Sequence, residues 1–265
     1  MRSGEPPFLY DVAFNELLAR LEDVRRNFTR ALIIGCTGRD GRAQLTAIVG
    51  SVTVSEPSPA VAAAFGGIAA DEDRLPFADD SFDLVVAVGS LDDIDDLPGA
   101  LLLIRRVLRP DGLMLAALGA AGSLPRLRSA MLAADAVGGA AAARMHPAID
   151  VRTGGDLLAR AGFALPVADT RTIELSYTGL AKLVADLRVH GATNILDRRS
   201  RKPLGRAAFA AASADFAAHA VDGRTIERVD ILYLSGWCQA AISPDDSSVS
   251  RRPIRGRSAG GMASP

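Results

Sequence analysis

Small and acidic residues at the ends of apolar runs are the positions in this sequence best suited to bind a ligand. The stretch ALIIGCTGRDG, residues 31–41, leads from an apolar run into a bend, Gly35-Cys36-Thr37-Gly38. Small residues let the backbone approach a ligand, and the start of a following helix offers free N–H groups. Glu56 lies 21 positions after Gly35, close to the spacing at which an acidic residue accepts the ribose hydroxyls in dinucleotide folds. This pair predicts an adenosine site; the alternatives are a tight turn without ligand and a charge at a helix start.

A second acidic stretch precedes another apolar run. In AADEDRLPFADDSFDLVV, residues 69–86, either Asp71 or Glu72 is placed to reach an adenine edge, and Ser90 ends the apolar run 82–90. The alternative is a solvated acidic loop. We therefore group Asp71, Glu72 and Ser90 with the glycine bend and Glu56 as candidate cofactor-binding residues.

Parallel strands between helices are the elements that must position these residues. Short, fully apolar runs are typical of strands in a parallel sheet that is covered on both faces, and they occur at 31–35, 47–56, 82–90 and 112–118. Amphipathic or alanine-rich patterns predict helices at 8–28, 57–65 and 97–112, the last ended by a turn at Pro110 and Gly112. The fold class predicted is α/β, doubly wound, with ligands bound where the strand order reverses.

In the second half of the chain, predicted helices and strands no longer alternate regularly. Its pattern predicts helices at 123–144 and 154–163 and β-rich runs at 164–177 and 228–238. We expect an N-terminal helical segment (1–28), a main domain (29–242) with helical lid insertions at about 120–150 and 178–224, and a disordered tail (243–265), because the tail is polar and rich in Gly, Ser and Pro.

Composition excludes several classes of protein. The 265 residues carry a formal net charge of −1 with dispersed basic residues, which argues against a nucleic-acid partner. Cys36 and Cys238 are far apart and have no metal-ligand spacing, so we expect neither a disulfide nor a metal site. No long apolar segment or signal peptide is present, and we expect a cytoplasmic protein without membrane insertion.

At the acidic loop and the runs after it, the sequence resembles a known family. ADEDRLPFADDSFDLVVAV followed by DLPGALLLIRRVLRPDGLMLAAL is similar to the acidic loop and the fourth and fifth strands of class I S-adenosylmethionine-dependent methyltransferases of type 11. The resemblance implies a Rossmann-like sheet of seven strands, S-adenosyl-L-methionine as cofactor and a protein or small-molecule methyl acceptor.

Segments in the second half of the chain resemble one particular group within this family. HPAIDVRTGGDLLARAGFALPVADTRTIELSY, LVADLRVHGATNILDRR and ILYLSGWC are similar to segments of bacterial relatives of the mitochondrial complex I assembly factor 5 group. Proteins of that group have the methyltransferase fold and hydroxylate an arginine of an NADH dehydrogenase subunit. The resemblance therefore implies a link to respiratory complex I assembly, with an NADH dehydrogenase subunit as the protein partner. Malonyl-carrier O-methyltransferases are also similar.

Departures from the family pattern favour a second interpretation. Ile33 stands where the family has Asp, and Thr37 replaces a Gly or marks a deletion, so cofactor affinity is expected to fall by about ten- to a hundredfold. After the third apolar run an aromatic wall of the family is replaced by acidic residues, including Asp92 and Asp93. These changes leave open a catalytically eroded pseudoenzyme that keeps the fold as an assembly or binding protein.

No residue is assigned to catalysis, because methyl transfer chiefly requires alignment of the acceptor and exclusion of water. The acidic run 92–96 is interpreted as a hydrated helix start, with recognition of a basic substrate or a metal as alternatives. His146 and His190 lack an obvious carboxylate partner in the sequence, and His219 lies in an alanine-rich helix, so all three are expected to be structural. Trp237 is expected to pack in the core. Three polar residues of the 178–224 insertion have two equal interpretations, the lining of a substrate mouth and the polar surface of a helix: Asp186, Arg188 and Asn194.

Overall fold

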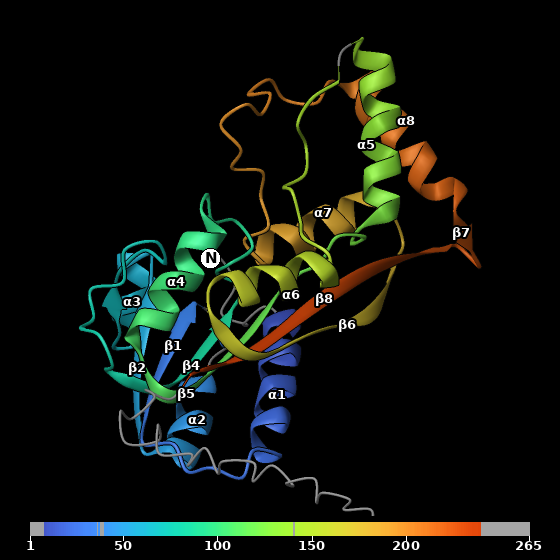
Figure 1. The fold of residues 1–265 in the computed structure, drawn as a ribbon. Coiled ribbons are helices and arrows are strands. Elements are labelled where there is room, and N and C mark those ends of the chain that lie inside the picture. Colours follow the sequence, from blue (N-terminus) through green and yellow to red (C-terminus); the bar gives the residue numbers. More distant parts are fainter. Residues whose placement is uncertain (1–7, 36, 38–39, 140, 240–265) are drawn as a thin grey trace, which may run out of the picture.

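A computed structural model describes residues 8–35, 37, 40–139 and 141–239, so Cys36, Gly38 and the expected C-terminal tail lie outside the described residues. The elements follow in the order α1 (Phe8–Glu22), β1 (Arg30–Gly35), α2 (Gly41–Val49), β2 (Ser51–Glu56), α3 (Pro59–Ala64), β3 (Ile68–Ala69), β4 (Phe82–Val88), α4 (Leu97–Val107), β5 (Leu108–Gly119), α5 (Pro125–Gly138), α6 (Val151–Arg160), β6 (Phe163–Tyr177), α7 (Leu180–Val189), α8 (Arg206–Ala218), β7 (Ala220–Val221) and β8 (Arg224–Cys238) (Figure 1).

A single twisted sheet organises the chain, and it confirms the predicted doubly wound α/β class. Its strand order is β3-β2-β1-β4-β5-β8-β6, and the two-residue β7 pairs with β8 outside this path. The first five strands are parallel, whereas β8 runs antiparallel to both of its neighbours. The chain moves outward from β1 to β3 and then crosses to β4 on the other side of β1. This reversal places a ligand-binding crevice beyond the carboxyl ends of β1 and β4.

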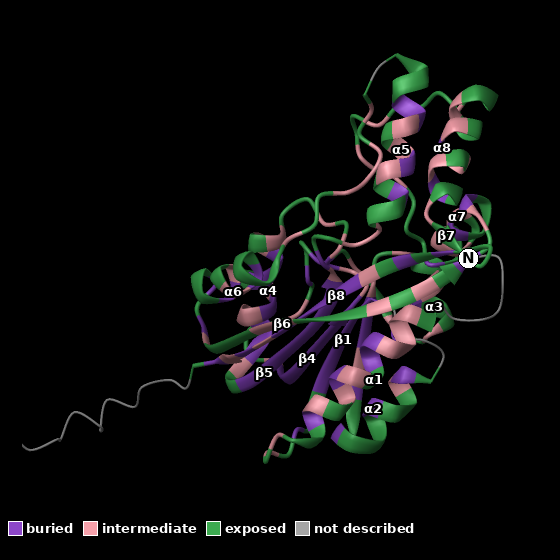
Figure 2. Cartoon of the chain, turned by 90° about the vertical axis from the view of Figure 1, so that its right-hand side faces the viewer, coloured by how far each residue is buried: buried purple, intermediate pink, exposed green. Residues whose placement is uncertain are grey.

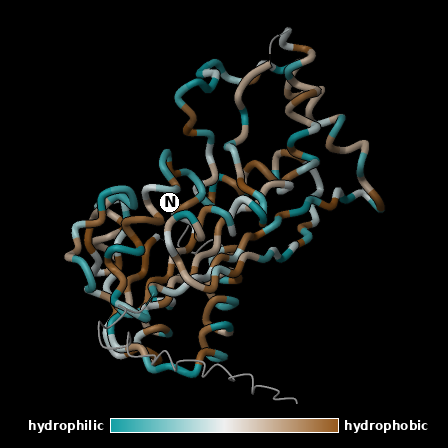
Figure 3. The backbone as a smooth tube through the Cα atoms, in the orientation of Figure 1, coloured by the Kyte–Doolittle hydropathy of each residue, from teal (hydrophilic) through white to brown (hydrophobic). Residues whose placement is uncertain are grey.

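The sheet separates two apolar cores because successive residues of a strand point to opposite faces. On one face α4 and α6 pack against a core that includes Leu32 and Ile34. On the other face α1 and α2 pack against a core that includes Ile33. Figure 2 shows β4 buried throughout, β5 buried from residue 112 to residue 118, and the edge strand β6 largely exposed. Figure 3 shows the apolar residues concentrated on the central strands.

A helical lobe stands beyond one end of the sheet and has a third core of its own. It consists of α5, α7 and α8, whose apolar side chains pack with Tyr177 at the end of β6. The fully buried Glu227 of β8 holds the start of α5, since its carboxylate accepts the N–H groups of Arg126 (3.2 Å) and Leu127 (2.8 Å). The free N–H groups of a helix start favour an anionic partner, so this carboxylate fastens the lobe to the sheet.

Several predicted boundaries were wrong by a few residues, each for a local reason. The apolar run 47–56 contains the end of α2 as well as β2, because Gly50 (φ +88°) ends the helix and donates its N–H to the Thr46 carbonyl. The helix expected at 97–112 stops at Val107, and the chain continues directly into β5. The predicted turn at Pro110 and Gly112 lies within β5. There Asp111 has a positive φ (61°), and the pairing of β4 with β5 shifts register.

The N-terminal helix is shorter than the 8–28 predicted and is tied to the far edge of the sheet. It ends at Glu22, and the chain beyond it brings Phe28 into stacking contact with Trp237. Trp237, expected in the core, is half-buried and packs against it. Arg20 of α1 makes a bidentate pair with Asp169 of β6 (2.6 and 2.7 Å) and covers the Tyr233 ring. None of the helices in the described ranges is long and apolar enough to cross a bilayer.

Candidate functional site

The carboxyl ends of β1 and β4 meet at Gly35 and Ser90. Gly35 has φ +83°, and a Cβ placed on it would lie 2.5 Å from the Val88 carbonyl oxygen and 2.6 Å from the Ser90 Cβ. Positive φ and this crowding together exclude a larger residue. The Ser90 hydroxyl lies 3.4 Å from the carbonyl of Ile34. Two of the predicted cofactor-binding residues therefore lie in contact where the strand order reverses.

The rest of the glycine bend is only partly described. Thr37 is buried, and its side chain packs so closely on Gly41 at the start of α2 that a Cβ there would lie 2.5 Å from the threonine Oγ1. It borders a hollow of about 190 Å³ that is also lined by Asp11 and Asp40. Cys36 and Gly38, which complete the predicted bend, lie outside the described residues.

The predicted acidic residues lie at the neighbouring strand ends. Glu56 ends β2, and its carbonyl accepts the N–H of Ala70 (3.2 Å) just after β3. Glu72 is buried, whereas Asp71 is exposed. Burial raises the pKa of Glu72 to about 7, and the negative charges of Glu56 and Asp71 add to this effect; burial likewise raises the pKa of Glu56. The structure thus brings Glu56 and Glu72 within electrostatic reach of one another.

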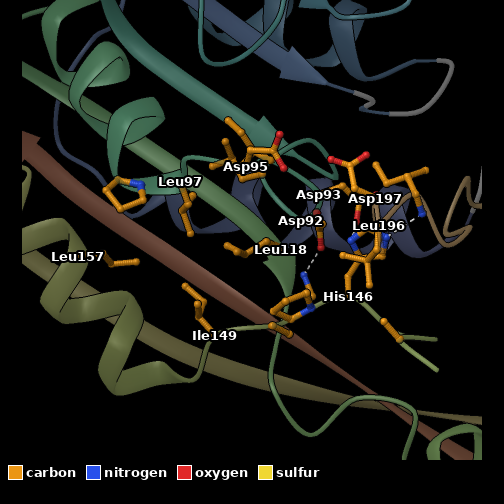
Figure 4. Close-up of a pocket in the computed structure, with 18 of the residues that line it drawn as sticks. Asp92, Asp93, Asp95, Leu97, Leu118, His146, Ile149, Leu157, Leu196 and Asp197 are labelled. Carbon is orange, nitrogen blue, oxygen red and sulfur yellow. Dashed lines mark hydrogen bonds and ion pairs between the residues drawn. The ribbon is translucent and has the colours of Figure 1, made fainter. Parts of the chain in front are cut away.

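Three adjoining cavities open beyond the carboxyl ends of β4 and β5. The largest, of about 720 Å³, lies under the segments 143–149 and 195–198 (Figure 4), and two smaller ones of about 210 and 180 Å³ adjoin it. Asp92 and Gly119 line all three. The predicted cofactor residues do not line these cavities, so the cofactor candidates and the main hollow occupy neighbouring regions of the same sheet edge.

Asp92 occupies the junction of these cavities. Its Oδ1 accepts the backbone N–H of Gly119, while its Oδ2 is inaccessible to water and has no hydrogen-bond partner among the described residues. Burial raises the pKa of this carboxyl to about 6, and the adjacent Asp93 adds to the shift. The acidic run was interpreted from the sequence as a hydrated helix start; that interpretation holds for Asp96, which caps α4 by accepting the Gly99 N–H (2.9 Å), but not for Asp92.

The comparisons with known proteins agree with this architecture. Residues 32–116 match a family model described as a methyltransferase domain. The human protein named arginine-hydroxylase NDUFAF5, mitochondrial, is 32% identical over 254 residues, which cover 89% of this chain and 72% of that protein. The chain belongs to the class I S-adenosylmethionine-dependent methyltransferase family.

Other relatives lie in the same family. A malonyl-[acyl-carrier protein] O-methyltransferase of Laribacter hongkongensis is 33% identical to this methyltransferase over 66% of its chain and 57% of the relative's. The YcgJ protein of Bacillus subtilis shares the fold with a TM-score of 0.56 at 15% identity, covering 86% of this chain and 99% of that one.

Ile33 stands at the position where the family has an acidic residue. It is fully buried in the core against α1 and α2. Its side chain therefore contributes packing on that face of the sheet and offers no charge to a ligand.

One histidine has a carboxylate partner that the sequence did not reveal. His146 Nδ1 lies 3.3 Å from Asp93 Oδ1, and its Nε2 accepts the N–H of Ile195 (3.1 Å). His146 also lines the two larger cavities, and its structural role stays a prediction. The two residues come from different loops, and no periodic pattern or motif connects them.

The remaining polar candidates are dispersed. His190 is buried and contacts the Asp186 carbonyl (2.8 Å) and the Phe8 ring, and His219 contacts the Asp215 carbonyl (2.9 Å). Of the three residues expected at a substrate mouth, Asn194 lines the second cavity and donates to the Ala143 carbonyl (2.7 Å). Asp186 and Arg188 are not among the residues lining the three cavities.

Proposed function

We propose that this methyltransferase binds S-adenosyl-L-methionine across the carboxyl ends of β1, β2 and β4 and presents it to an acceptor in the 720 Å³ cavity. The observation that carries the proposal is the contact of Gly35 with Ser90 at the reversal point, beside the Glu56–Glu72 carboxylates. Ligands of open α/β sheets bind at such a point.

The described residues fit the cofactor. Gly35 has a positive φ and lies so close to Val88 and Ser90 that no Cβ fits there, so the bend that would present backbone N–H groups to a ligand requires glycine at this position. Glu56 has the position along the chain of the residue that accepts ribose hydroxyls, and Glu72 is a buried acceptor for the amino group of the adenine. When bound, the cofactor supplies an activated methyl group. We assign binding to Gly35, Thr37, Glu56, Asp71, Glu72 and Ser90, with Cys36 and Gly38 completing the bend.

The protein's own residues then have to orient the acceptor and exclude water. The segments 143–149 and 195–198 line the cavity, and its apolar lining includes Leu118, Ile149 and Leu157. Alignment of an acceptor in a dry, shaped site is sufficient for a large acceleration. This agrees with the sequence analysis, which assigned no residue to catalysis.

The acceptor we propose is an arginine side chain of a protein partner, with an NADH dehydrogenase subunit as the candidate. Two observations support it: the similarity over 89% of the chain to a relative named arginine-hydroxylase, and the carboxylates of Asp92 and Asp93 on the cavity wall. A role in respiratory complex I assembly follows from that partner.

Isothermal titration with S-adenosylmethionine and S-adenosylhomocysteine tests the cofactor site. We expect saturable heat for both ligands and an affinity about tenfold lower in Glu56→Gln, since a charge-assisted hydrogen bond to the ribose is lost. Glu174→Gln, an exposed change on β6, is the matched control and should bind like the wild type. Absence of heat at millimolar ligand would overturn the proposal, and an unchanged affinity in Glu56→Gln would refute the placement.

The second candidate function is a methyltransferase fold retained as an assembly or binding protein without catalysis. The buried Ile33 favours it, because the loop lacks a carboxylate for the methionine ammonium, a loss on the order of 1.5–3 kcal/mol. Incubation of the protein and an NADH dehydrogenase subunit with methyl-labelled cofactor separates the two: label on the subunit supports the enzyme, whereas complex formation without label supports the scaffold.

A further inference from the structure

Asp92 is held in place at the junction of the three cavities. The preceding residue, Leu91, is buried in the core beneath α4, and Asp92 Oδ1 accepts the Gly119 N–H from the end of β5. A Cβ placed on Gly119 would lie 3.0 Å from that oxygen, so this close contact requires a glycine or a shift of the carboxylate. The loop after β4 and the end of β5 therefore fix the position of the carboxyl group.

The second oxygen of Asp92 is the unusual feature. Oδ2 is inaccessible to water and has no donor among the described residues, although Asp92 as a residue is only partly buried and lines each cavity. A buried acceptor without a donor is costly, and such a group in a native protein calls for an explanation. A ligand N–H reaches Oδ2 only when the side chains that cover this oxygen shift, and such a donor would remove that cost.

The charges around the largest cavity indicate the sign of that ligand. Its lining contains four carboxylates and one guanidinium: Asp92, Asp93, Asp95, Asp197 and Arg198. In the adjoining cavity Arg144 is already paired with Asp135 (2.6 Å), and Arg128 is the other cation. A carboxylate acceptor would approach several like charges at once, whereas a cationic group would be attracted.

The opposite side of the same cavity is apolar. Leu118, Ile149 and Leu157 lie on one side in Figure 4, and Asp92, Asp93 and His146 lie on the other. An alkyl stem that ends in a nitrogen head group matches this division, because the stem contacts the apolar side while the head group reaches the carboxylates.

We propose that Asp92 is the acceptor-binding residue that sets specificity: its Oδ2 accepts an N–H of a cationic nitrogen head group on an alkyl stem, and its charge rejects carboxylate acceptors. This deepens the proposed function by naming the residue that selects the acceptor, and it depends on that function only in taking the cavity as the acceptor site. It distinguishes this chain from a methyltransferase that acts on a malonyl carboxylate.

Protein-observed NMR titration tests the assignment with three probes of matched stem: propylguanidinium, propylammonium and butyrate. We expect wild-type protein to bind at least one of the two cations about tenfold or more tightly than butyrate, and Asp92→Asn to lose at least about tenfold in that affinity. Asp95→Asn removes an equal charge from the same cavity and should change the affinity less than about threefold. Comparison of the two cations shows which head group is preferred.

The outcomes are separable. Butyrate binding as tightly as either cation, or equal losses in Asp92→Asn and Asp95→Asn, would overturn the proposal, since the latter indicates diffuse charge only. A cooperative thermal transition in each variant verifies folding. Cation selectivity that persists in a protein without S-adenosylmethionine binding would refute the proposed function and leave the role of Asp92 intact; the converse result would refute only the role of Asp92.

Discussion

Replacement of Asp92 by Asn should stabilise the protein at high pH and not at low pH. Burial raises the pKa of this carboxyl from 3.8 to about 6 in the folded state. The folded state therefore holds the proton more tightly than the unfolded state, and the free energy of unfolding falls as the pH rises from about 4 to about 6. At about 1.4 kcal/mol per pKa unit, the ionised group costs roughly 3 kcal/mol above pH 6.

Asn cannot ionise, so Asp92→Asn removes this pH-dependent cost. Its amide leaves a buried donor unpaired, a pH-independent penalty of about 1–3 kcal/mol, and the informative quantity is therefore the change with pH. Urea unfolding at about pH 4.5 and pH 8 should show the variant gaining about 2 kcal/mol relative to wild type between the two conditions. The exposed Asp95→Asn serves as control. Parallel pH profiles for wild type and Asp92→Asn would refute the assignment of a buried, unpaired carboxylate.

Two further predictions concern the other buried carboxylates. The pKa of Glu72 is about 7, and its ionised form is the better hydrogen-bond acceptor. The affinity for S-adenosylmethionine, measured by titration calorimetry, should therefore rise about tenfold from pH 6 to pH 8. Glu72→Gln should remove this pH dependence, and an unchanged pH dependence would contradict a role of Glu72 in cofactor binding. Glu227→Gln should lower the free energy of unfolding by about 2–3 kcal/mol, because an amide NH₂ would face the N–H groups at the start of α5. The exposed Glu174→Gln should be neutral in chemical denaturation, and equal stability of both variants would argue against the cap.

The parts of the fold that depend on local pattern could be predicted from the sequence. Apolar runs identified the central strands, and because the carboxyl ends of parallel strands share one edge, the proximity of Gly35 and Ser90 followed from the topology. The core position of Ile33 also follows from alternation, since it shares a face with Ala31. Predicted element boundaries were wrong where a single residue sets the boundary, as Gly50 does between α2 and β2.

The cavity could not be predicted, because its residues meet through loops that have no periodic pattern. The pairing of His146 with Asp93 joins two such segments. Asp92 and its neighbour in the sequence have the same residue type, yet one contacts Gly119 and the other a histidine. Which of the two aspartates contacts Gly119 depends on where β5 ends relative to the loop after β4. Local sequence patterns do not define that position.

The separate core of the helical lobe has a consequence for how acceptor choice can change. The largest cavity is lined on one side by the loop after β4 (residues 91–95) and the end of β5, and on the other side by the coils at 143–149 and 195–198, which adjoin helices of the lobe. Met145 and the helices on either side of 195–198 pack in the core of the lobe, whereas Leu91 and Leu118 pack in the core beneath α4, so the two coils are suitable positions for grafting. Exchange of these coils between relatives offers a route to new acceptors in which the adenosyl-facing strand ends keep their sequence.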